Sequence, residues 1–320
     1  MSHLIKKLED KVMAGKEITF SEAIELYQTE DLEELFGAAN RIREKFTGNK
    51  VDLCTIMNAK SGKCSENCKF CAQSAHYSTG VEVYPLVDVE KALKLAKENE
   101  ASGAHRFSLV TSGKGILQKD WEKVLTIYKV LRKETNLKLC ASLGIISYEQ
   151  ALQLKEVGVT MYHHNVETSR DYFPKICTTH TYQERIDTIK NVLRAGLDIC
   201  CGGIIGMGES FEDRINMAFE IKELGVKSIP INILNPIKGT PLENLKPLEP
   251  QEILKTMAVF RFIIPDSFIR YAGGRSALGE LQRQGLKAGV NAALVGNYLT
   301  TVGNKISEDI QMIKEEGLEV

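Results

Sequence analysis

From residue 51 onward, short β-rich segments alternate with amphipathic segments that have helical spacing. The strand candidates are rich in β-branched and other apolar residues and lie at 51–57, 106–111, 137–143, 160–166, 197–205, 228–234, 267–272 and 291–296. The helix candidates between them lie at 89–100, 121–134, 148–158, 182–196 and 211–225. Repeated strand–helix units of this kind predict a (β/α)8 barrel of the TIM type, with an open doubly wound sheet as the alternative.

The first 50 residues have a different pattern, with helical spacing and no strand candidate. Thr19 is followed three residues later by Glu22, which is a capping-box pattern at the start of a helix. We therefore predict a helical extension over residues 1–50 and a barrel with a C-terminal segment over 51–320. Four prolines, at 236, 241, 247 and 250, indicate one irregular loop after the sixth strand.

Composition narrows the class of protein. The chain has 320 residues, 43% hydrophobic and 26% charged, with 41 basic and 42 acidic side chains and a net charge of −1. These values exclude a disordered chain, and a net charge near zero argues against nucleic acid as a bulk electrostatic partner. No apolar run approaches the roughly 20 residues that cross a bilayer. The polar N-terminus lacks the apolar core of a secretion signal, so we expect a cytoplasmic protein with no membrane partner.

Three of the eight cysteines crowd into the loop after the first predicted strand, where barrels of this type place their chemistry. Cys64, Cys68 and Cys71 have the spacing C-x3-C-x2-C. Three thiolates on one tight loop can hold three irons of a [4Fe–4S] cubane and leave the fourth iron open to a small molecule. The alternative is a structural zinc loop that borrows a distant fourth ligand.

A second motif, G-x-I-x-G-x-x-E, ends the fifth predicted strand with Gly202, Ile204, Gly206 and Glu209. Glycines at such a place let a ligand approach the backbone, although a plain glycine-rich turn explains them equally well. The spacing does not match a dinucleotide-binding fingerprint.

The cysteine spacing, with Phe70 just before the last cysteine, resembles the radical S-adenosylmethionine superfamily. The resemblance implies that S-adenosylmethionine chelates the open iron of a [4Fe–4S] cluster and is cleaved by one electron to a 5′-deoxyadenosyl radical. The resemblance also implies that the glycine motif contacts the adenine of S-adenosylmethionine.

Further segments narrow the resemblance to the biotin synthase family over nearly the whole chain after residue 50. They are Y-H-H-N-V-E-T-S (162–169), T-T-H-T-Y-Q-E-R (178–185), P-I-N (230–232), K-G-T-P-L (238–242), R-x-x-x-G-R (270–275) and L-T-T (299–301). The implied reaction inserts sulfur from a second, auxiliary iron–sulfur cluster into dethiobiotin. The family also implies a flavodoxin or ferredoxin type of electron donor and a homodimer.

The same resemblance gives roles to single residues. Asn165 and Glu167 match positions that meet S-adenosylmethionine, and Arg185 matches the position that meets its carboxylate. Asn165 and Asn232 match contacts to the ureido ring of the substrate. The remaining implied positions are Phe70, Gly202, Ile204 and Gly206 at the cofactor and Thr300 and Thr301 at the carboxylate tail of the substrate. We expect His163 and His164 to be structural.

The auxiliary cluster is where the sequence departs from the family. Cys140, Cys200 and Arg270 match family ligands, but the third cysteine of the usual set is replaced by Ser108, and a serine oxygen is a poor substitute for a thiolate at iron. Cys54 stands where the family has a serine that lines the cluster pocket. We predict that Cys54, Cys140 and Cys200 hold this cluster, either a four-iron cluster with an additional sulfide or a [2Fe–2S] cluster.

Two other cysteines and two other functions remain as alternatives. Cys177 is a weaker candidate ligand for the auxiliary cluster, and Cys201 is expected to face away from its neighbour Cys200. Within the superfamily, a hydrogenase-cofactor maturase or a methylornithine synthase is the alternative enzyme. Outside it, the alternative is an iron–sulfur or zinc scaffold or redox sensor.

Overall fold

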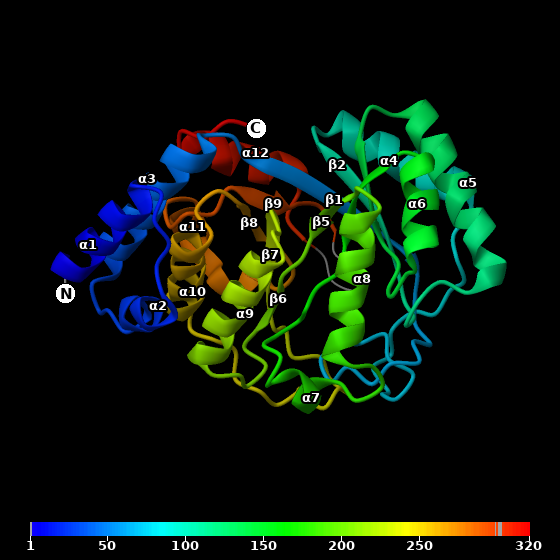
Figure 1. The fold of residues 1–320 in the computed structure, drawn as a ribbon. Coiled ribbons are helices and arrows are strands. Elements are labelled where there is room, and N and C mark those ends of the chain that lie inside the picture. Colours follow the sequence, from blue (N-terminus) through cyan, green and yellow to red (C-terminus); the bar gives the residue numbers. More distant parts are fainter. Residues whose placement is uncertain (1, 298, 300–302) are drawn as a thin grey trace.

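The centre of the molecule is a closed barrel of parallel strands (Figure 1). The computed structural model describes residues 2–297, 299 and 303–320. The strands are β1 (Asp52–Lys60), β2 (Arg106–Thr111), β3 (Lys138–Ser142), β4 (Val159–His163), β5 (Asp198–Cys200), β6 (Gly203–Ile205), β7 (Ser228–Ile233), β8 (Phe268–Tyr271) and β9 (Ala292–Leu294). The strands follow one another in the order β5-β4-β3-β2-β1-β9-β8-β7-β6, and pairing of β5 with β7 near the two ends of this order closes the sheet, which confirms the predicted barrel over the open sheet.

The fifth predicted strand, 197–205, is divided into β5 and β6 at Cys201 and Gly202. β5 pairs with β4 and, through Cys200 and Ser228, with β7. β6 pairs with β7 and forms one further bridge between Gly203 and Glu167. Gly202 passes so close to β7 that a Cβ there would stand 1.9 Å from the carbonyl oxygen of Pro230. Only glycine fits this approach, so packing between two backbones already explains Gly202.

Helices cover the outside of the barrel (Figure 1). Six of these helices are α4 (Val89–Ala101), α5 (Gln118–Glu134), α6 (Tyr148–Glu156), α8 (Tyr182–Arg194), α9 (Phe211–Glu223) and α10 (Pro250–Ile263). The shorter elements and the last helix are α7 (Phe173–Ile176), the 3-10 helix η1 (Arg275–Leu281), α11 (Gln282–Leu286) and α12 (Ile306–Glu315). Capping boxes fix the starts of α6, α8 and α9.

The helices predicted from the sequence did not include α10. The proline-rich segment after β7 is irregular as expected, but Pro250 is the first residue of this helix rather than part of the loop. A proline fits there because the first helical residue has no backbone partner for an N–H group.

The N-terminal extension consists of α1 (Ser2–Met13), α2 (Phe20–Tyr27) and α3 (Leu32–Thr47). The predicted capping box of Thr19 and Glu22 is present at α2. α3 packs against α10, and α2 packs against α9 and α10, so the extension covers one side of the barrel. The division of the chain at residue 50 stays a prediction. Among the described residues, no helix has the length and apolar character to span a membrane.

Alternation along β1 sets which side chains face the interior. Leu53, Thr55 and Met57 are buried on the outer face, whereas Cys54 and Ile56 face a cavity at the mouth of the barrel. This period of two is the ordinary geometry of a strand. Every second residue of β1 therefore faces the interior of the barrel.

We predict that Gly202→Ala destabilises the barrel, because the added methyl group would overlap the Pro230 carbonyl. The free energy of unfolding should fall by about 1–3 kcal/mol, the usual cost of overpacking, measured by urea denaturation. The control is Gly225→Ala. Gly225 also lies outside the strands, and an added Cβ would meet no atom, although its φ of +70° favours glycine. A Gly202→Ala variant as stable as the wild type would contradict the close approach.

Candidate active site

A cavity of about 380 Å³ opens at the mouth of the barrel and brings the three predicted auxiliary-cluster cysteines together. Cys54, Cys140 and Cys200 come from β1, β3 and β5, and all three line it. The neighbouring Cys140 thiol, together with burial, raises the pKa of Cys54. All three thiols are free of disulfides. Three converging thiols of this kind suit iron, which displaces the thiol protons when it binds.

Two arginines on the same wall share one carboxylate. Arg270 Nη2 lies 2.5 Å from Asp52 Oδ2, and Arg106 Nε lies 3.1 Å from the same oxygen. Burial alone would raise the pKa of Asp52, but Arg270 and Arg106 outweigh it and hold that pKa below its ordinary value. One negative and two positive charges leave an excess of +1 beside the thiols. An anionic cluster in this cavity would offset that buried charge.

Sequence reasoning missed Asp52, although a signal was present. Asp52 lies two residues before Cys54 on the same strand, so the period of two puts both on the same face. An acidic residue at that position is the expected partner for two buried arginines.

Ser108 lies at the position where the resemblance implies a cysteine ligand of the auxiliary cluster. It pairs in register with Cys140 and lines the same cavity. Its buried Oγ has no hydrogen-bond partner among the described residues. An unpaired buried hydroxyl costs free energy, which indicates that the cavity accommodates a group able to satisfy it.

The loop after β1 carries Cys64, Cys68 and Cys71. Cys71 N donates to Cys68 O at 3.0 Å, and Cys64 N donates to Gln73 O at 2.9 Å. These bonds hold the loop in a tight turn with all three thiols free. Burial raises the pKa of Cys71 to about 11. The residue types and the free thiols fit the cubane expected from the spacing.

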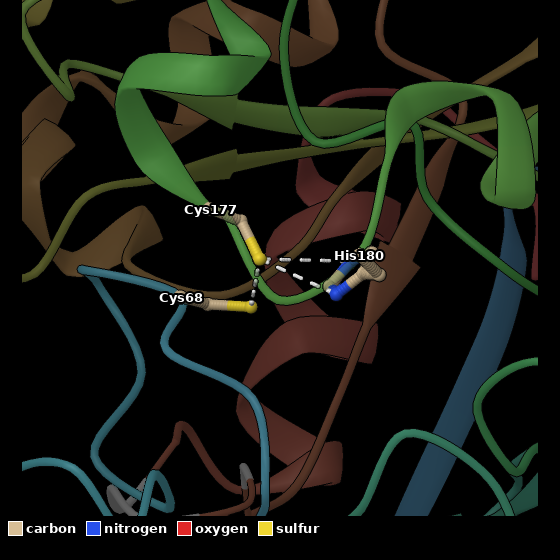
Figure 2. A group of neighbouring side chains, drawn as sticks. All are labelled: Cys68, Cys177 and His180. Atoms are coloured by element: carbon tan, nitrogen blue, oxygen red, sulfur yellow. Dashed lines mark hydrogen bonds between the residues drawn. The ribbon is translucent and has the colours of Figure 1, made fainter.

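Cys177 does not lie in the auxiliary cavity, so its placement there as a weaker ligand is wrong. Its Sγ lies 3.7 Å from Cys68 Sγ (Figure 2). The two sulfurs meet because the chain after α7 lies against the loop that carries Cys64, Cys68 and Cys71, here called the cluster loop. His180 Nδ1 lies 3.3 Å from the Cys177 sulfur and 2.6 Å from Glu66 Oε2. Sequence reasoning missed Glu66 and His180, since only the fold brings these two loops together.

Asn165, Glu167 and Arg185 form a connected group between the two sets of cysteines. Arg185 Nη1 donates to the backbone oxygen of Asn165 at 2.8 Å, and Asn165 Nδ2 donates to Glu167 Oε2 at 3.2 Å. Asn165 and Glu167 line both the large cavity and a smaller one beside Cys64 and Cys68. Glu167 has a φ of +71°, a conformation that non-glycine residues adopt at a cost and that concentrates at functional sites.

The other predicted site residues do not all lie in the same place. Phe70, Ile204 and Asn232 line the large cavity, and His163 lines both cavities. Gly206 N donates to Glu209 Oε1 at 2.7 Å, so Glu209 organises this turn. Cys201 is fully buried in the main core, as expected for a side chain that faces away from Cys200. Thr300 and Thr301 lie outside the described residues.

We predict that Asp52→Asn destabilises the apoprotein by about 3–5 kcal/mol at pH 7, the cost of breaking a buried ion pair from one side. The folded-state pKa of Asp52 is lowered, so its contribution is complete above the unfolded value of about 3.9 and is lost as pH falls through the folded value. The difference between the two proteins should therefore shrink below about pH 4, measured by denaturant unfolding.

The control for this prediction is Glu34→Gln, which removes an exposed partner of Arg41 and should cost less than about 1 kcal/mol. A difference between Asp52→Asn and the wild type that stays constant down to pH 2 would contradict the role of the Asp52 charge.

Comparison with known proteins identifies the family. A model of the radical SAM superfamily matches residues 59–221, and a model of the biotin and thiamin synthesis associated domain matches residues 230–319. Biotin synthase of Acetivibrio thermocellus is 66% identical over 98% of both chains, and that of Clostridioides difficile is 62% identical over the full length of both.

Solved structures share the fold at much lower identity. Methylornithine synthase (PylB) has a TM-score of 0.83 at 21% identity, covering 98% of this chain and 96% of its own. The FeFe-hydrogenase maturase HydG of Carboxydothermus hydrogenoformans has a TM-score of 0.83 at 16% identity, covering 98% and 78%. These two likenesses concern the fold alone, so the alternative enzymes are not favoured. The identities above 60% over the full chain decide the assignment, and the chain belongs to the biotin synthase family.

Proposed function

We propose that this chain inserts sulfur into dethiobiotin to form biotin, using S-adenosylmethionine and two iron–sulfur clusters. The observation that carries the proposal is identity above 60% with biotin synthases over the full chain. The two separate sets of three free thiols at one barrel mouth agree with it. When bound, the cubane supplies the electron that cleaves S-adenosylmethionine, and the auxiliary cluster supplies the sulfur.

Cys64, Cys68 and Cys71 would hold the cubane, with Phe70 beside it. Arg185 would meet the carboxylate of S-adenosylmethionine, because a guanidinium has five N–H donors and the protein engages only some of them. Asn165 and Glu167 offer an amide and a carboxylate on the wall between the two cavities. Gly202, Ile204 and Gly206 complete the proposed cofactor side.

Cys54, Cys140 and Cys200 would hold the auxiliary cluster, with Arg270 as the neighbouring cation. The excess positive charge of Arg270 and Arg106 over Asp52 supports an anionic occupant. With a serine at position 108, three thiolates remain, which suits a four-iron cluster with an additional sulfide as well as a [2Fe–2S] cluster.

The substrate would lie in the same cavity, next to these thiols. Asn232 donates one N–H to Gly203 O and accepts from Gly273 N, which leaves a donor and a lone pair for a ureido group. Asn165, in the loop just after β4, would support the ureido ring, and Thr300 and Thr301 belong to the proposed carboxylate end. Contacts at both ends of the substrate would fix the position of the two reacting carbons.

The proposal includes three features of the cellular setting. A flavodoxin or ferredoxin type of protein would deliver the electron, and the chain would act as a homodimer. A cytoplasmic location is proposed because free thiols and reduced clusters need a reducing compartment.

The test is an anaerobic assay of the reconstituted protein with dethiobiotin, S-adenosylmethionine and a reductant. We expect biotin and 5′-deoxyadenosine, together with iron and sulfide for two clusters per chain. One zinc per chain and no 5′-deoxyadenosine would instead support a metal-binding scaffold.

We predict that Cys68→Ala reduces 5′-deoxyadenosine formation to background, because the cubane loses one of three ligands and cannot present an open iron. The measurement is product formation by liquid chromatography after anaerobic reconstitution. The control is Cys201→Ala, which removes a buried thiol outside both sets and should retain product formation. Measurable 5′-deoxyadenosine from Cys68→Ala would contradict the cubane assignment.

We predict that Cys54→Ser abolishes biotin formation and leaves S-adenosylmethionine cleavage intact. The loss of iron also reports the size of the auxiliary cluster: about half of the iron is lost if it has four irons, and about a third if it has two. Iron and sulfide analysis measures this directly. A Cys54→Ser variant that keeps its auxiliary cluster and makes biotin would contradict the ligand assignment.

A further inference from the structure

Cys177 is a buried thiol in direct contact with the proposed cubane ligand Cys68. The two sulfurs lie 3.7 Å apart, and both side chains are buried (Figure 2). Cys177 comes from the chain just after α7, about 110 positions away in sequence. None of the roles assigned above uses this thiol.

Backbone and side-chain hydrogen bonds fix the segment that carries Cys177 onto the cluster loop. Lys69 N donates to Ile176 O at 3.0 Å, and Thr178 N donates to Asn67 Oδ1 at 2.9 Å. Asn67 N donates to Thr179 Oγ1 at 3.1 Å. These hydrogen bonds hold the backbones of the two loops together, so they also hold the two sulfurs in contact.

In the structure Cys68 Sγ donates to Cys177 Sγ, and Cys177 Sγ donates to Asn67 Oδ1. Iron at Cys68 would replace the Cys68 proton, so the partners of Cys177 then decide where the Cys177 proton points. Two oxygens lie 3.5 Å from its sulfur, Asn67 Oδ1 and Thr179 Oγ1. The first already accepts from two backbone N–H groups, and the second accepts from Asn67 N and donates to Glu66. An iron-bound Cys68 has no proton to give and carries negative charge, so its sulfur is the strongest acceptor beside Cys177.

His180 holds the other side of Cys177. Arg185 Nε donates to His180 Nε2 at 3.1 Å, so the neutral ring carries its proton on Nδ1. That proton points to Glu66 Oε2 at 2.6 Å, with the Cys177 sulfur also within 3.3 Å. Neither ring nitrogen then offers an acceptor to Cys177, because Nδ1 carries the proton and the lone pair of Nε2 is engaged by Arg185, which leaves the Cys177 proton for Cys68.

We propose that Cys177 is a positioning residue for the cubane, donating its S–H to the Cys68 thiolate when that sulfur binds iron. The inference rests on the proposed function and deepens the same site. A hydrogen bond to a ligand sulfur stabilises the reduced, more negative cluster and raises its reduction potential. The chain Cys68–Cys177–His180–Arg185 also links the cubane to the proposed S-adenosylmethionine contacts.

A single metal ion on Cys68, Cys177 and His180 is a different reading of the same group, since their ligand atoms lie within 4.8 Å of one another. The imidazole argues against it. One ring nitrogen accepts from Arg185 and the other donates to Glu66, so neither lone pair is free for a metal.

The test uses the anaerobically reconstituted holoenzyme with both clusters and three variants: Cys177→Ala, Cys177→Ser and the control Cys201→Ala. The cubane signal is identified by electron paramagnetic resonance through its change on adding S-adenosylmethionine. Its midpoint potential is then measured by redox titration, and exchangeable deuterons near the reduced cluster are measured by pulsed resonance in D₂O.

We expect Cys177→Ala to assemble the cubane with a more negative midpoint potential and to lose one exchangeable deuteron. Cys177→Ser, whose hydroxyl still donates, should lie near the wild type, and Cys201→Ala should be unchanged. The inference is overturned if Cys177→Ala keeps the wild-type potential and deuteron signal, or if it folds without assembling the cubane, since Cys177 would then be a ligand. A wild type that forms no cubane contradicts the proposed function itself.

Discussion

Closure of the parallel sheet is the constraint on which the candidate site depends. In an open sheet, side chains from β1, β3 and β5 would be spread along one face, with β1 and β5 separated by three strands. Pairing of β1 with β9 and of Cys200 with Ser228 closes the sheet and turns that row into a ring around one axis. The division between β5 and β6 at Gly202 lets β5 reach both neighbours. The convergence of three thiols is thus a consequence of topology.

Charge inside this ring follows from the same geometry. Arg106 and Arg270 point inward because each occupies an inward position of its strand, and burial of two guanidinium groups is costly without anions. Asp52 supplies one negative charge, which leaves a charge of +1 on this wall of the cavity. The other carboxylate that lines the cavity, Glu167, is paired with Arg185. The site is therefore already selective for an anionic occupant before any metal enters.

The sequence predicted most of the barrel because alternation and strand length depend on local residues. The resemblance to the biotin synthase family implied that Cys140 and Cys200 share a cavity, and the same resemblance together with the alternation along the first strand added Cys54. The alternation along β1 could also have predicted that Asp52 lies on the same face of the strand as Cys54. The pairing of Cys177 with Cys68 could not be predicted in this way, because it depends on how two loops far apart in sequence cross. α10 was not predicted because Pro250 was assigned to the loop, although a proline is also common in the first turn of a helix.

The wall between the two sets of cysteines is joined by a chain of contacts to the loop that carries Cys68. Asn165 and Glu167 line both cavities, and Arg185 holds the backbone of Asn165 while its Nε holds His180. His180 in turn contacts Cys177, which contacts Cys68. Any ligand that displaces Arg185 from His180 alters the donor set around the cluster loop. The residues that would bind S-adenosylmethionine and those that surround the Cys68 sulfur therefore form one hydrogen-bonded unit, in which occupancy of one part changes the electrostatic environment of the other.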